Sequence, residues 1–277
     1  MNYLNQIKRV SASDIAAYQQ NGHVRINQVC EKKNIDDFRH QVNLSVNKRK
    51  EMINLAPLEE RSTYDKAFLQ IMNIWVENPQ LAKWILSKRF AGVAAQLMGV
   101  EKVRIYHDQA LFKEPSGGFT PWHQDQHYWP LETDNCITMW MPLMDITRDM
   151  GTLNFASGTS KVGYLGDMPI SDDSEAYLSK LCAEQGFDIA NYGNMEAGDA
   201  TFHSGWCLHG AGPNLTNTLR EVMTIIWYED NTKIIARPDP QNRWNASREN
   251  DLATWLPGCS EGEEAASEIN PLISPFS

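Results

Sequence analysis

The sequence predicts a mainly β protein of the α+β class, in which N-terminal helices pack outside a β sandwich or barrel. About the first hundred residues carry apolar patterns of helical period. From Lys102 onward, short segments rich in β-branched and aromatic residues alternate with Gly, Pro, Asn and Asp, as strands and turns do. Because the strands follow the helices and no linker divides the chain, we expect a single domain over residues 1–277.

The helical region, residues 1–100, predicts three helices and one strand. Residues that commonly cap helices precede apolar stripes at Ser13, Asn34 and Asn78. Gly22 and Gly99 are the expected stops of the first and third helices. The segment HVRI, directly after Gly22, predicts a short strand.

The core strands are expected in residues 101–230. Five segments predict them: VRIYHDQALF, CITMWMPLMDI, GTLNFAS, DATFHS and EVMTIIWYE. Residues 162–196 predict an insertion between strands that is helical from about Asp173 to Gln185. Residues 231–277 predict a C-terminal tail, with GCSEGEEAASE as exposed loop.

Composition narrows the possible partners. The net charge of −10 argues against nucleic acid and against an anionic membrane surface. The only dense basic run, residues 48–50, is followed by Glu51 and predicts a solvated helix face. These observations favour a small molecule as the main partner.

The cysteines and the N-terminus indicate the compartment. Five cysteines are widely scattered and form no C-x-x-C pair, so neither a disulfide framework nor a zinc ribbon is predicted. The N-terminus lacks an apolar signal core, and no apolar run approaches the ~20 residues of a membrane span. We expect a cytoplasmic protein with reduced cysteines.

The segment PWHQDQHYWP, residues 121–130, contains the first candidate metal ligands. His123 and Asp125 are two residues apart, and such residues point to the same face of an extended strand. An imidazole beside a carboxylate supplies two-thirds of a common metal site. A third ligand is therefore expected elsewhere in the chain.

Two histidines, His203 and His209, could each complete the site, and both lie in GDATFHSGWCLHGAGPN. Arg220 follows His209 by eleven residues and opens the strand EVMTIIWYE. An antiparallel pairing of the two segments would place His209 and Arg220 on the same wall. This favours His209 as the ligand, with His203 as the alternative that lines the pocket.

Two histidines and one carboxylate on one face of a metal leave its other positions open, as in non-haem Fe(II) oxygenases. A 2-oxo acid can then chelate the metal while O2 takes the last position. The far carboxylate of the co-substrate needs a cation, and Arg220 offers a bidentate guanidinium fork. An H-x-D pair alone is common by chance. The prediction therefore depends on this pair together with His209, Arg220 and the predicted strands around them.

Three blocks of sequence resemble the phytanoyl-CoA dioxygenase family over roughly residues 10–230. They are WHQDQHYWP, MWMPLMDITRDMGTLNFASGTSK and GDATFHSGWCLHGAGPNLTNTLR. Members of this family depend on Fe(II), 2-oxoglutarate and O2 and release succinate and CO2. The resemblance implies a double-stranded β-helix (jelly-roll, cupin-like) core and hydroxylation of a small organic molecule.

The resemblance also implies roles for particular residues. The family's metal ligands fall on His123, Asp125 and His209, and its 2-oxoglutarate-binding arginine falls on Arg220. Residues that match positions near the co-substrate are Trp140, Gln109, Lys113 and Gln124. Because related halogenases carry a small residue in place of Asp125, hydroxylation is favoured over halogenation. The segment FASGTSK stands where the family usually has a loop of proline, glycine, serine and histidine. This difference affects only the expected conformation of that loop.

The expected substrate pocket combines apolar walls with a few polar groups. Candidate lining residues are Tyr106, His107, His127, Tyr128, Trp129, His203 and Trp227. His127 lies four residues after His123 and would share its strand face.

Two functions of other classes remain as alternatives. A cupin-type metal-dependent isomerase or epimerase could use the same metal site but would not need Arg220. A non-catalytic metal- or ligand-binding member would be indicated by the loss of a ligand residue.

Overall fold

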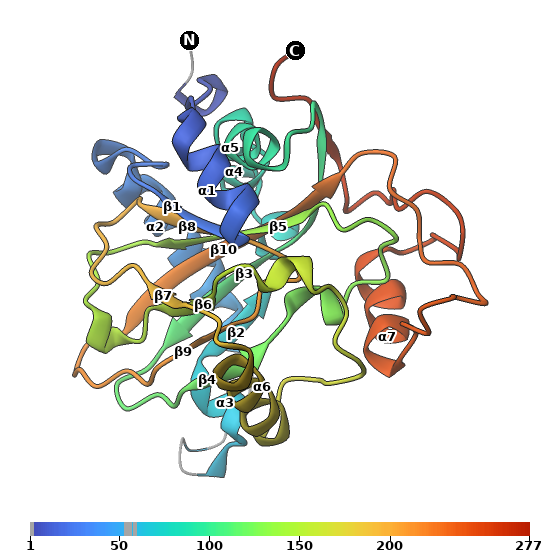
Figure 1. Cartoon of the computed structure of the whole chain (residues 1–277). Helices are drawn as coiled ribbons and strands as arrows, with labels where there is room; N and C mark the ends of the chain where they lie inside the picture. Colours follow the sequence, from blue (N-terminus) through green and yellow to red (C-terminus); the bar gives the residue numbers. More distant parts are fainter. Residues whose placement is uncertain (1–2, 53–56, 58–59) are drawn as a thin grey trace.

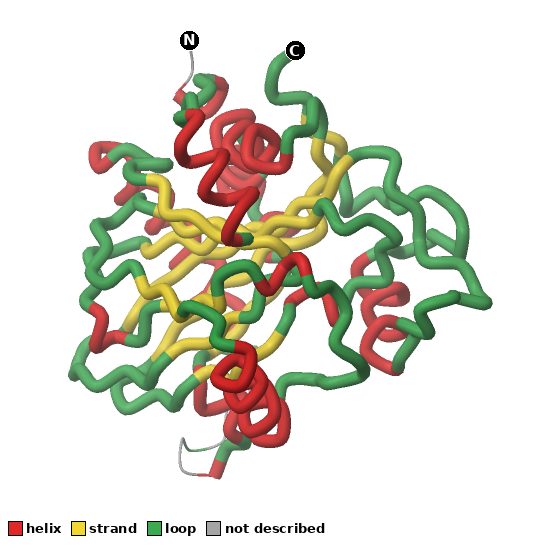
Figure 2. The backbone as a smooth tube through the Cα atoms, viewed as in Figure 1, coloured by secondary structure: helices red, strands yellow, loops and turns green. Residues whose placement is uncertain are grey.

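Two antiparallel sheets form the core of the computed structural model, which describes residues 3–52, 57 and 60–277. The larger sheet has the strand order β1-β8-β5-β10-β3-β11, with β2 also paired to β3, and the smaller has the order β4-β9-β6-β7. The two layers of strands lie one above the other in Figure 2. This arrangement confirms the predicted jelly-roll core.

The larger sheet contains seven strands: β1 (His23–Ile26), β2 (Leu69–Met72), β3 (Val103–Lys113), β5 (Cys136–Pro142), β8 (Ala200–Ser204), β10 (Arg220–Glu229) and β11 (Leu272–Ile273). The smaller contains β4 (Thr120–His123), β6 (Leu153–Ala156), β7 (Ile189–Asn191) and β9 (His209–Ala211). All five segments predicted as core strands contain a strand. The short strands β2, β7 and β11 were not predicted, because two to four residues carry little periodicity.

Helices cover the outer face of the larger sheet. They are α1 (Ala12–Asn21), α2 (Lys32–Lys50), α4 (Pro79–Ile85) and α5 (Lys88–Met98), and Figure 1 shows α1, α4 and α5 on one side of that sheet. Phe38 of α2 and Phe90 of α5 are fully buried in one cluster with Met139 and Ile225 of the sheet. Burial of these apolar side chains is the main force that holds the helices in place.

The predicted helix starts were wrong at two positions. Ser11, not Ser13, caps α1 by accepting a hydrogen bond from the backbone of Asp14. The second helix starts at Lys32, before Asn34. The predicted third helix is two helices, because the side chain of Ser87 caps α5 anew after α4 has ended.

The insertion and the tail are more ordered than predicted. The insertion holds α6 (Asp172–Gln185), as expected, and also β7. In addition, α3 (Thr63–Ala67) lies next to β4, and the tail contains α7 (Ala246–Trp255) and β11. Short 3-10 helices also occur at Tyr3–Asn5, Ile74–Glu77, Asp125–His127, Arg148–Met150 and Thr159–Lys161.

The tail segment GCSEGEEAASE was predicted as an exposed loop. Most of it is exposed loop and turn, but Ala265 is fully buried and Lys233 forms an isolated β-bridge with Glu264. Because β11 also pairs with β3, the tail packs on the core, and we propose that residues 1–277 fold as one domain. Within the described residues, no helix combines the length and the apolar character needed to cross a membrane.

Candidate metal centre and co-substrate pocket

A cavity of about 270 Å³ lies between the two sheets. Strands of the larger sheet contribute His107, Gln109, Thr138, Trp140 and Arg220 to its walls. The smaller sheet contributes Thr120, His123, Leu153, His209 and Ala211. Further walls come from the segments 64–72, 128–129 and 250–255, and from Ile170 of the insertion.

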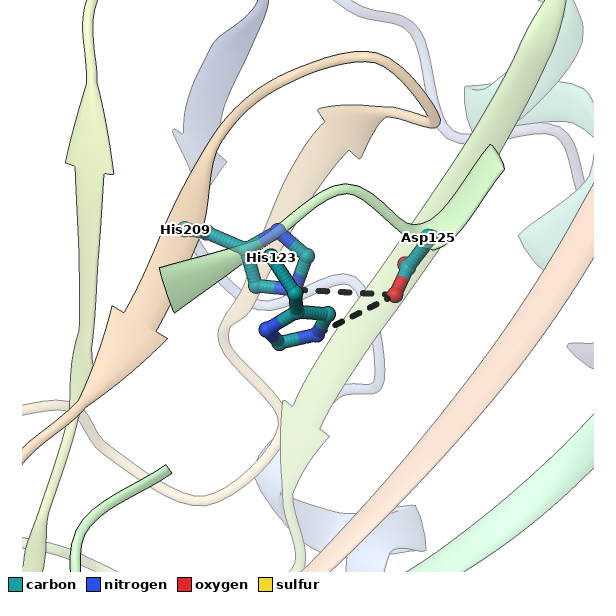
Figure 3. Close-up of side chains that lie close together, drawn as sticks. All are labelled: His123, Asp125 and His209. Atoms are coloured by element: carbon teal, nitrogen blue, oxygen red, sulfur yellow. Dashed lines mark ion pairs between the residues drawn. The ribbon is translucent and has the colours of Figure 1, made fainter. Parts of the chain in front are cut away.

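His123, Asp125 and His209 converge at this cavity (Figure 3). His123 ends β4 and pairs directly with His209 at the start of β9, so that their ring centroids lie 4.1 Å apart. Asp125 Oδ1 lies 3.5 Å from His123 Nε2 and 3.7 Å from His209 Nε2. The three ligand atoms lie within 4.8 Å of one another, close enough to bind one ion.

The backbone fixes the tautomer of both histidines. His123 Nδ1 donates to the carbonyl of Pro121 at 2.7 Å, and His209 Nδ1 donates to the carbonyl of Cys207 at 3.0 Å. A carbonyl can only accept, so each Nδ1 carries the proton and each Nε2 presents a lone pair to the cavity. This donor set fits a divalent transition metal such as Fe(II).

The second oxygen of Asp125 is held by two neighbours. Thr138 Oγ1 donates to Asp125 Oδ2 at 2.8 Å, and His203 Nε2 lies 3.2 Å from the same oxygen. Burial alone would raise the pKa of the Asp125 carboxyl, but His209 and the other histidines outweigh this effect and keep the pKa well below its usual range. The carboxyl is therefore ionised, and its Oδ1 faces the two imidazoles.

This geometry separates the two histidines that the sequence left open. His209 belongs to the metal-capable cluster, whereas His203 contacts the far oxygen of Asp125 and lines the cavity. The reasons given for preferring His209 were nevertheless wrong in part. The strands β9 and β10 belong to different sheets, so His209 and Arg220 reach the cavity from two walls and not one.

The expected strand through the H-x-D motif was also wrong. β4 ends at His123, and a 3-10 helix begins at Asp125 and includes His127. The turn, and not strand alternation, brings Asp125 back toward His123. His127 consequently points elsewhere: its Nε2 lies 3.6 Å from the exposed Asp167, outside the cavity walls.

Arg220 is a buried cation at the cavity wall, with 1% of its surface exposed. Its Nη1 donates to the carbonyl of Gly151, and its guanidinium carbon lies 5.2 Å from the ring centroid of Trp140. Its Nε is buried and has no hydrogen-bond partner among the described residues. Burial lowers the pKa of Arg220 to about 9, and no acidic group in the described part of the chain counteracts this shift. A buried guanidinium without a carboxylate is a strong candidate to bind an anion.

The other residues expected near the co-substrate divide into two groups. Trp140 and Gln109 line the cavity, and Gln109 Oε1 accepts from Gln70 Nε2 at 2.8 Å. Lys113 pairs with Arg220 in the strand register, but its Nζ donates to two backbone carbonyls and it is absent from the cavity walls. Burial, and then Arg220, lower the pKa of Lys113 to about 6.

Gln124 likewise does not face the cavity. Its amide donates to the carbonyls of Gly163 at 2.9 Å and Trp206 at 2.8 Å. It therefore ties the start of the insertion to the metal-ligand segment and has a structural role.

Four of the seven residues expected in the substrate pocket line the cavity, namely His107, Tyr128, Trp129 and His203. Three do not. Tyr106 is the extra residue of a bulge where β3 pairs with β10, and its hydroxyl donates to Asp251 of the cavity wall. Trp227 lies in the apolar cluster between the sheet and the helices, and His127 lies in the turn described above.

Sequence reasoning missed the contribution of α7. Asn250, Asp251 and Trp255 of this helix line the cavity. A signal was present, because the side chain of Asn245 caps the helix by accepting from the backbone of Arg248 at 2.8 Å. Asn followed by helix-forming residues could have predicted α7.

Arg248 of α7 supports the turn that carries Asp125. It is fully buried and donates to the carbonyls of Gln126 at 2.8 Å, His127 at 3.0 Å and Arg243 at 3.0 Å. We expect Arg248→Met to lower the free energy of unfolding by about 3 kcal/mol or more, because buried carbonyls lose their donors. Urea unfolding of the purified protein measures this. The exposed Arg237→Met is the control and should change stability little; equal effects of the two variants would contradict the supporting role.

Thr138 is expected to tune metal binding through Asp125. Thr138→Val removes the hydrogen bond to Oδ2 and should weaken Fe(II) binding by about 10–100-fold, the usual cost of losing a contact behind a metal ligand. Anaerobic titration with Fe(II) measures the effect. Thr201→Val is the matched control, because Thr201 lies in the same sheet and its buried hydroxyl has no partner among the described residues. If both variants bind Fe(II) like the wild type, the hydrogen bond does not support the ligand.

A jelly-roll core with two imidazoles and a carboxylate converging beside a buried arginine defines a class: the non-haem iron- and 2-oxoglutarate-dependent oxygenases. The model of the family "Phytanoyl-CoA dioxygenase (PhyH)" matches residues 18–222. The chain therefore belongs to the phytanoyl-CoA dioxygenase family.

Known proteins of related sequence and structure accord with this family. A probable alpha-ketoglutarate-dependent hypophosphite dioxygenase of Stutzerimonas stutzeri is 25% identical over 162 residues, which cover 55% of this chain and 56% of that protein. Thus the chain spans about half the length of that relative. Among solved structures, the carbocyclase SnoK has a TM-score of 0.75 at 21% identity, covering 96% of this chain and 97% of that one. The epimerase SnoN in complex with Fe3+, alpha ketoglutarate and nogalamycin RO has a TM-score of 0.73 at 18% identity, with 94% and 97% covered. The two structural likenesses establish the fold.

Proposed function

We propose that this protein is an Fe(II)- and 2-oxoglutarate-dependent dioxygenase that hydroxylates a small organic molecule, with succinate and CO2 as co-products. The observation that supports the proposal is the convergence of two histidine Nε2 atoms and Asp125 Oδ1 in a cavity that is also lined by Arg220, a buried cation without an acidic partner among the described residues. A metal site alone would fit several chemistries. The buried cation of Arg220 beside it requires an anionic partner, and 2-oxoglutarate would be that partner.

Each part of the site would have a separate task. His123, Asp125 and His209 would hold the iron, and bound Fe(II) supplies the oxidising chemistry together with O2 and 2-oxoglutarate. Arg220 would bind the distal carboxylate of 2-oxoglutarate, with Trp140 packed beside the guanidinium. The walls of the two sheets would keep bulk water away from the reacting groups.

The strand register separates the co-substrate end of the cavity from the substrate end. Arg220 pairs with Lys113 at one end of the β10–β3 pair, and Ile226 pairs with His107 six residues farther along β10. Since 2-oxoglutarate would be anchored at Arg220, the substrate would lie toward His107. The aromatic residues Tyr128, Trp129 and Trp255 also line the cavity.

Hydroxylation is favoured as the reaction because Asp125 retains the carboxylate that related halogenases lack. A cupin-type isomerase or epimerase that uses no 2-oxo acid would leave Arg220 without a function. The loss of a ligand residue, which would indicate a non-catalytic member, is not seen, because His123, Asp125 and His209 are all present. The carbocyclase and epimerase activities of the two structural neighbours belong to those proteins. Incorporation of one oxygen atom from labelled O2 into the product would distinguish hydroxylation from cyclisation or epimerisation.

The test requires no knowledge of the substrate. Purified protein is incubated with Fe(II), ascorbate, O2 and 2-oxoglutarate, and succinate is measured. We expect slow formation of succinate, because oxygenases of this class commonly decarboxylate 2-oxoglutarate without substrate. Absence of succinate, together with no 2-oxoglutarate-dependent absorption of the anaerobic Fe(II) protein, would contradict the proposal.

A further inference from the structure

We propose that the substrate carries a basic nitrogen, and that Asp251 and the aromatic side chains near it bind the resulting ammonium group. This inference rests on the proposed function, because it assigns the part of the same cavity that 2-oxoglutarate would not occupy. Asp251 belongs to α7, outside the blocks that resemble the family.

Asp251 is a buried acid at the cavity wall, with 8% of its surface exposed. Its Oδ2 accepts a hydrogen bond from the hydroxyl of Tyr106 at 2.8 Å, and Asn250 also hydrogen-bonds to its carboxyl. Burial raises the pKa of this carboxyl to about 7. A buried carboxylate is costly without a cation, and a cationic ligand would supply one.

Cationic side chains close to Asp251 do not provide that partner. The charge of Arg248, one helical turn earlier, lowers the pKa of the Asp251 carboxyl. Its guanidinium donates to three backbone carbonyls, however, and forms no ion pair with Asp251. His107 lines the same end of the cavity, and burial lowers its pKa to about 3, so it is neutral. Its Nδ1 is buried and unpartnered among the described residues, which leaves a polar atom for the substrate.

Aromatic rings surround this end of the cavity. The ring of Trp255 lies 5.1 Å from that of His107, and the ring of Trp129 lies 5.4 Å from that of Tyr106, whose hydroxyl contacts Asp251. Tyr128 also lines the cavity. Aromatic faces attract cations within about 6 Å of the ring centroid, and more strongly when the site is desolvated. A carboxylate and aromatic rings together suit an organic ammonium group.

Arg220 and Asp251, which carry opposite charges, lie toward opposite ends of the cavity. Arg220 lies at the end of the β10–β3 pair where an anion would bind, and Asp251 contacts Tyr106 toward the other end. An anionic substrate group would be repelled at Asp251, and the net charge of −10 attracts cations to the protein as a whole. The cavity of about 270 Å³ also favours a small molecule.

Two probes of nearly the same shape test the inference: benzylamine, which is a cation, and benzyl alcohol, which is neutral. Calorimetry of the anaerobic protein loaded with Fe(II) and 2-oxoglutarate gives both dissociation constants, about one pH unit above the pKa of about 7 of Asp251. We expect the wild type to bind benzylammonium at least about tenfold more tightly than benzyl alcohol. Asp251→Asn should reduce this ratio to about twofold or less.

Glu249→Gln is the matched control, since it removes a carboxylate from the exposed side of the same helix. This variant should keep the wild-type preference for the ammonium probe. No preference in the wild type, whether both probes bind equally or neither binds, would overturn the inference. A preference for the ammonium probe that is undiminished in Asp251→Asn would also overturn the inference. The wild-type comparison decides even if Asp251→Asn fails to fold.

Failure of this inference can be told apart from failure of the proposed function. Succinate formation and binding of 2-oxoglutarate by the wild type test the oxygenase assignment and involve neither probe. Succinate formation without preference for the ammonium probe would reject only the basic substrate. Absence of both succinate and 2-oxoglutarate binding would reject the oxygenase itself.

Discussion

Substitution of Arg220 by methionine is expected to raise the 2-oxoglutarate concentration for half-maximal succinate formation by about thirtyfold or more. Loss of one partner from a buried, hydrogen-bonded charge pair costs roughly 2–5 kcal/mol. Arg220 has no acidic partner among the described residues, so 2-oxoglutarate would compensate for the burial of its charge. Titration of the anaerobic Fe(II) protein with 2-oxoglutarate, followed by absorption, measures the same loss without turnover.

The stability of this variant provides a second readout. Because Arg220 is a buried cation with an unpartnered Nε, its replacement by an apolar residue of similar length should leave stability unchanged or increase it. Binding of Fe(II) should also be preserved, since Arg220 lies outside the metal-capable cluster. Arg237→Met, at an exposed ion pair, is the control and should bind 2-oxoglutarate like the wild type. An unchanged 2-oxoglutarate requirement in Arg220→Met would place the anion site elsewhere.

The sequence predicted the parts of the site that rest on short motifs. An H-x-D pair is common by chance, but His123 and Asp125 could be recognised because the chain also carries the segment with His209 and Arg220. The turn that brings His123 and Asp125 together was not foreseen. The core strands could be predicted because each is long enough to show alternation or an apolar run. β10, with nine of its ten residues buried, is an example.

Features that depend on contacts distant in sequence could not be predicted. Thr138 is an ordinary strand residue in the sequence, and only the packing of β5 beneath the 3-10 helix makes it a partner of Asp125. Lys113 is adjacent to Arg220 in register, yet its amine is taken by the carbonyls of Gly118 and Gly212. Asp251 reaches the cavity only because the tail returns to the core.

Asp125 is the residue whose substitution should have the largest effect on activity. Asp125→Asn keeps the size of the side chain and one oxygen, but removes the negative charge that two neutral imidazoles need to bind a divalent cation. We expect the affinity for Fe(II) and the rate of succinate formation each to fall by more than about a hundredfold, because even contacts behind a ligand cost 10–100-fold. Metal analysis after anaerobic reconstitution and the succinate assay measure the two losses separately.

Asp167→Asn is the matched control for this substitution. Asp167 is exposed and lies 3.6 Å from His127, outside the cavity walls, so its charge should not affect iron. Comparison with Asp125→Ala isolates charge from geometry: if the two Asp125 variants lose iron equally, charge is decisive, whereas retention of iron by Asp125→Asn alone would assign part of the role to the remaining oxygen. Retention of both iron and turnover by Asp125→Ala would mean that the metal binds elsewhere. The proposed assignment of ligands would then be wrong, while the fold would stand and the proposed anion site at Arg220 would still be tested separately by Arg220→Met.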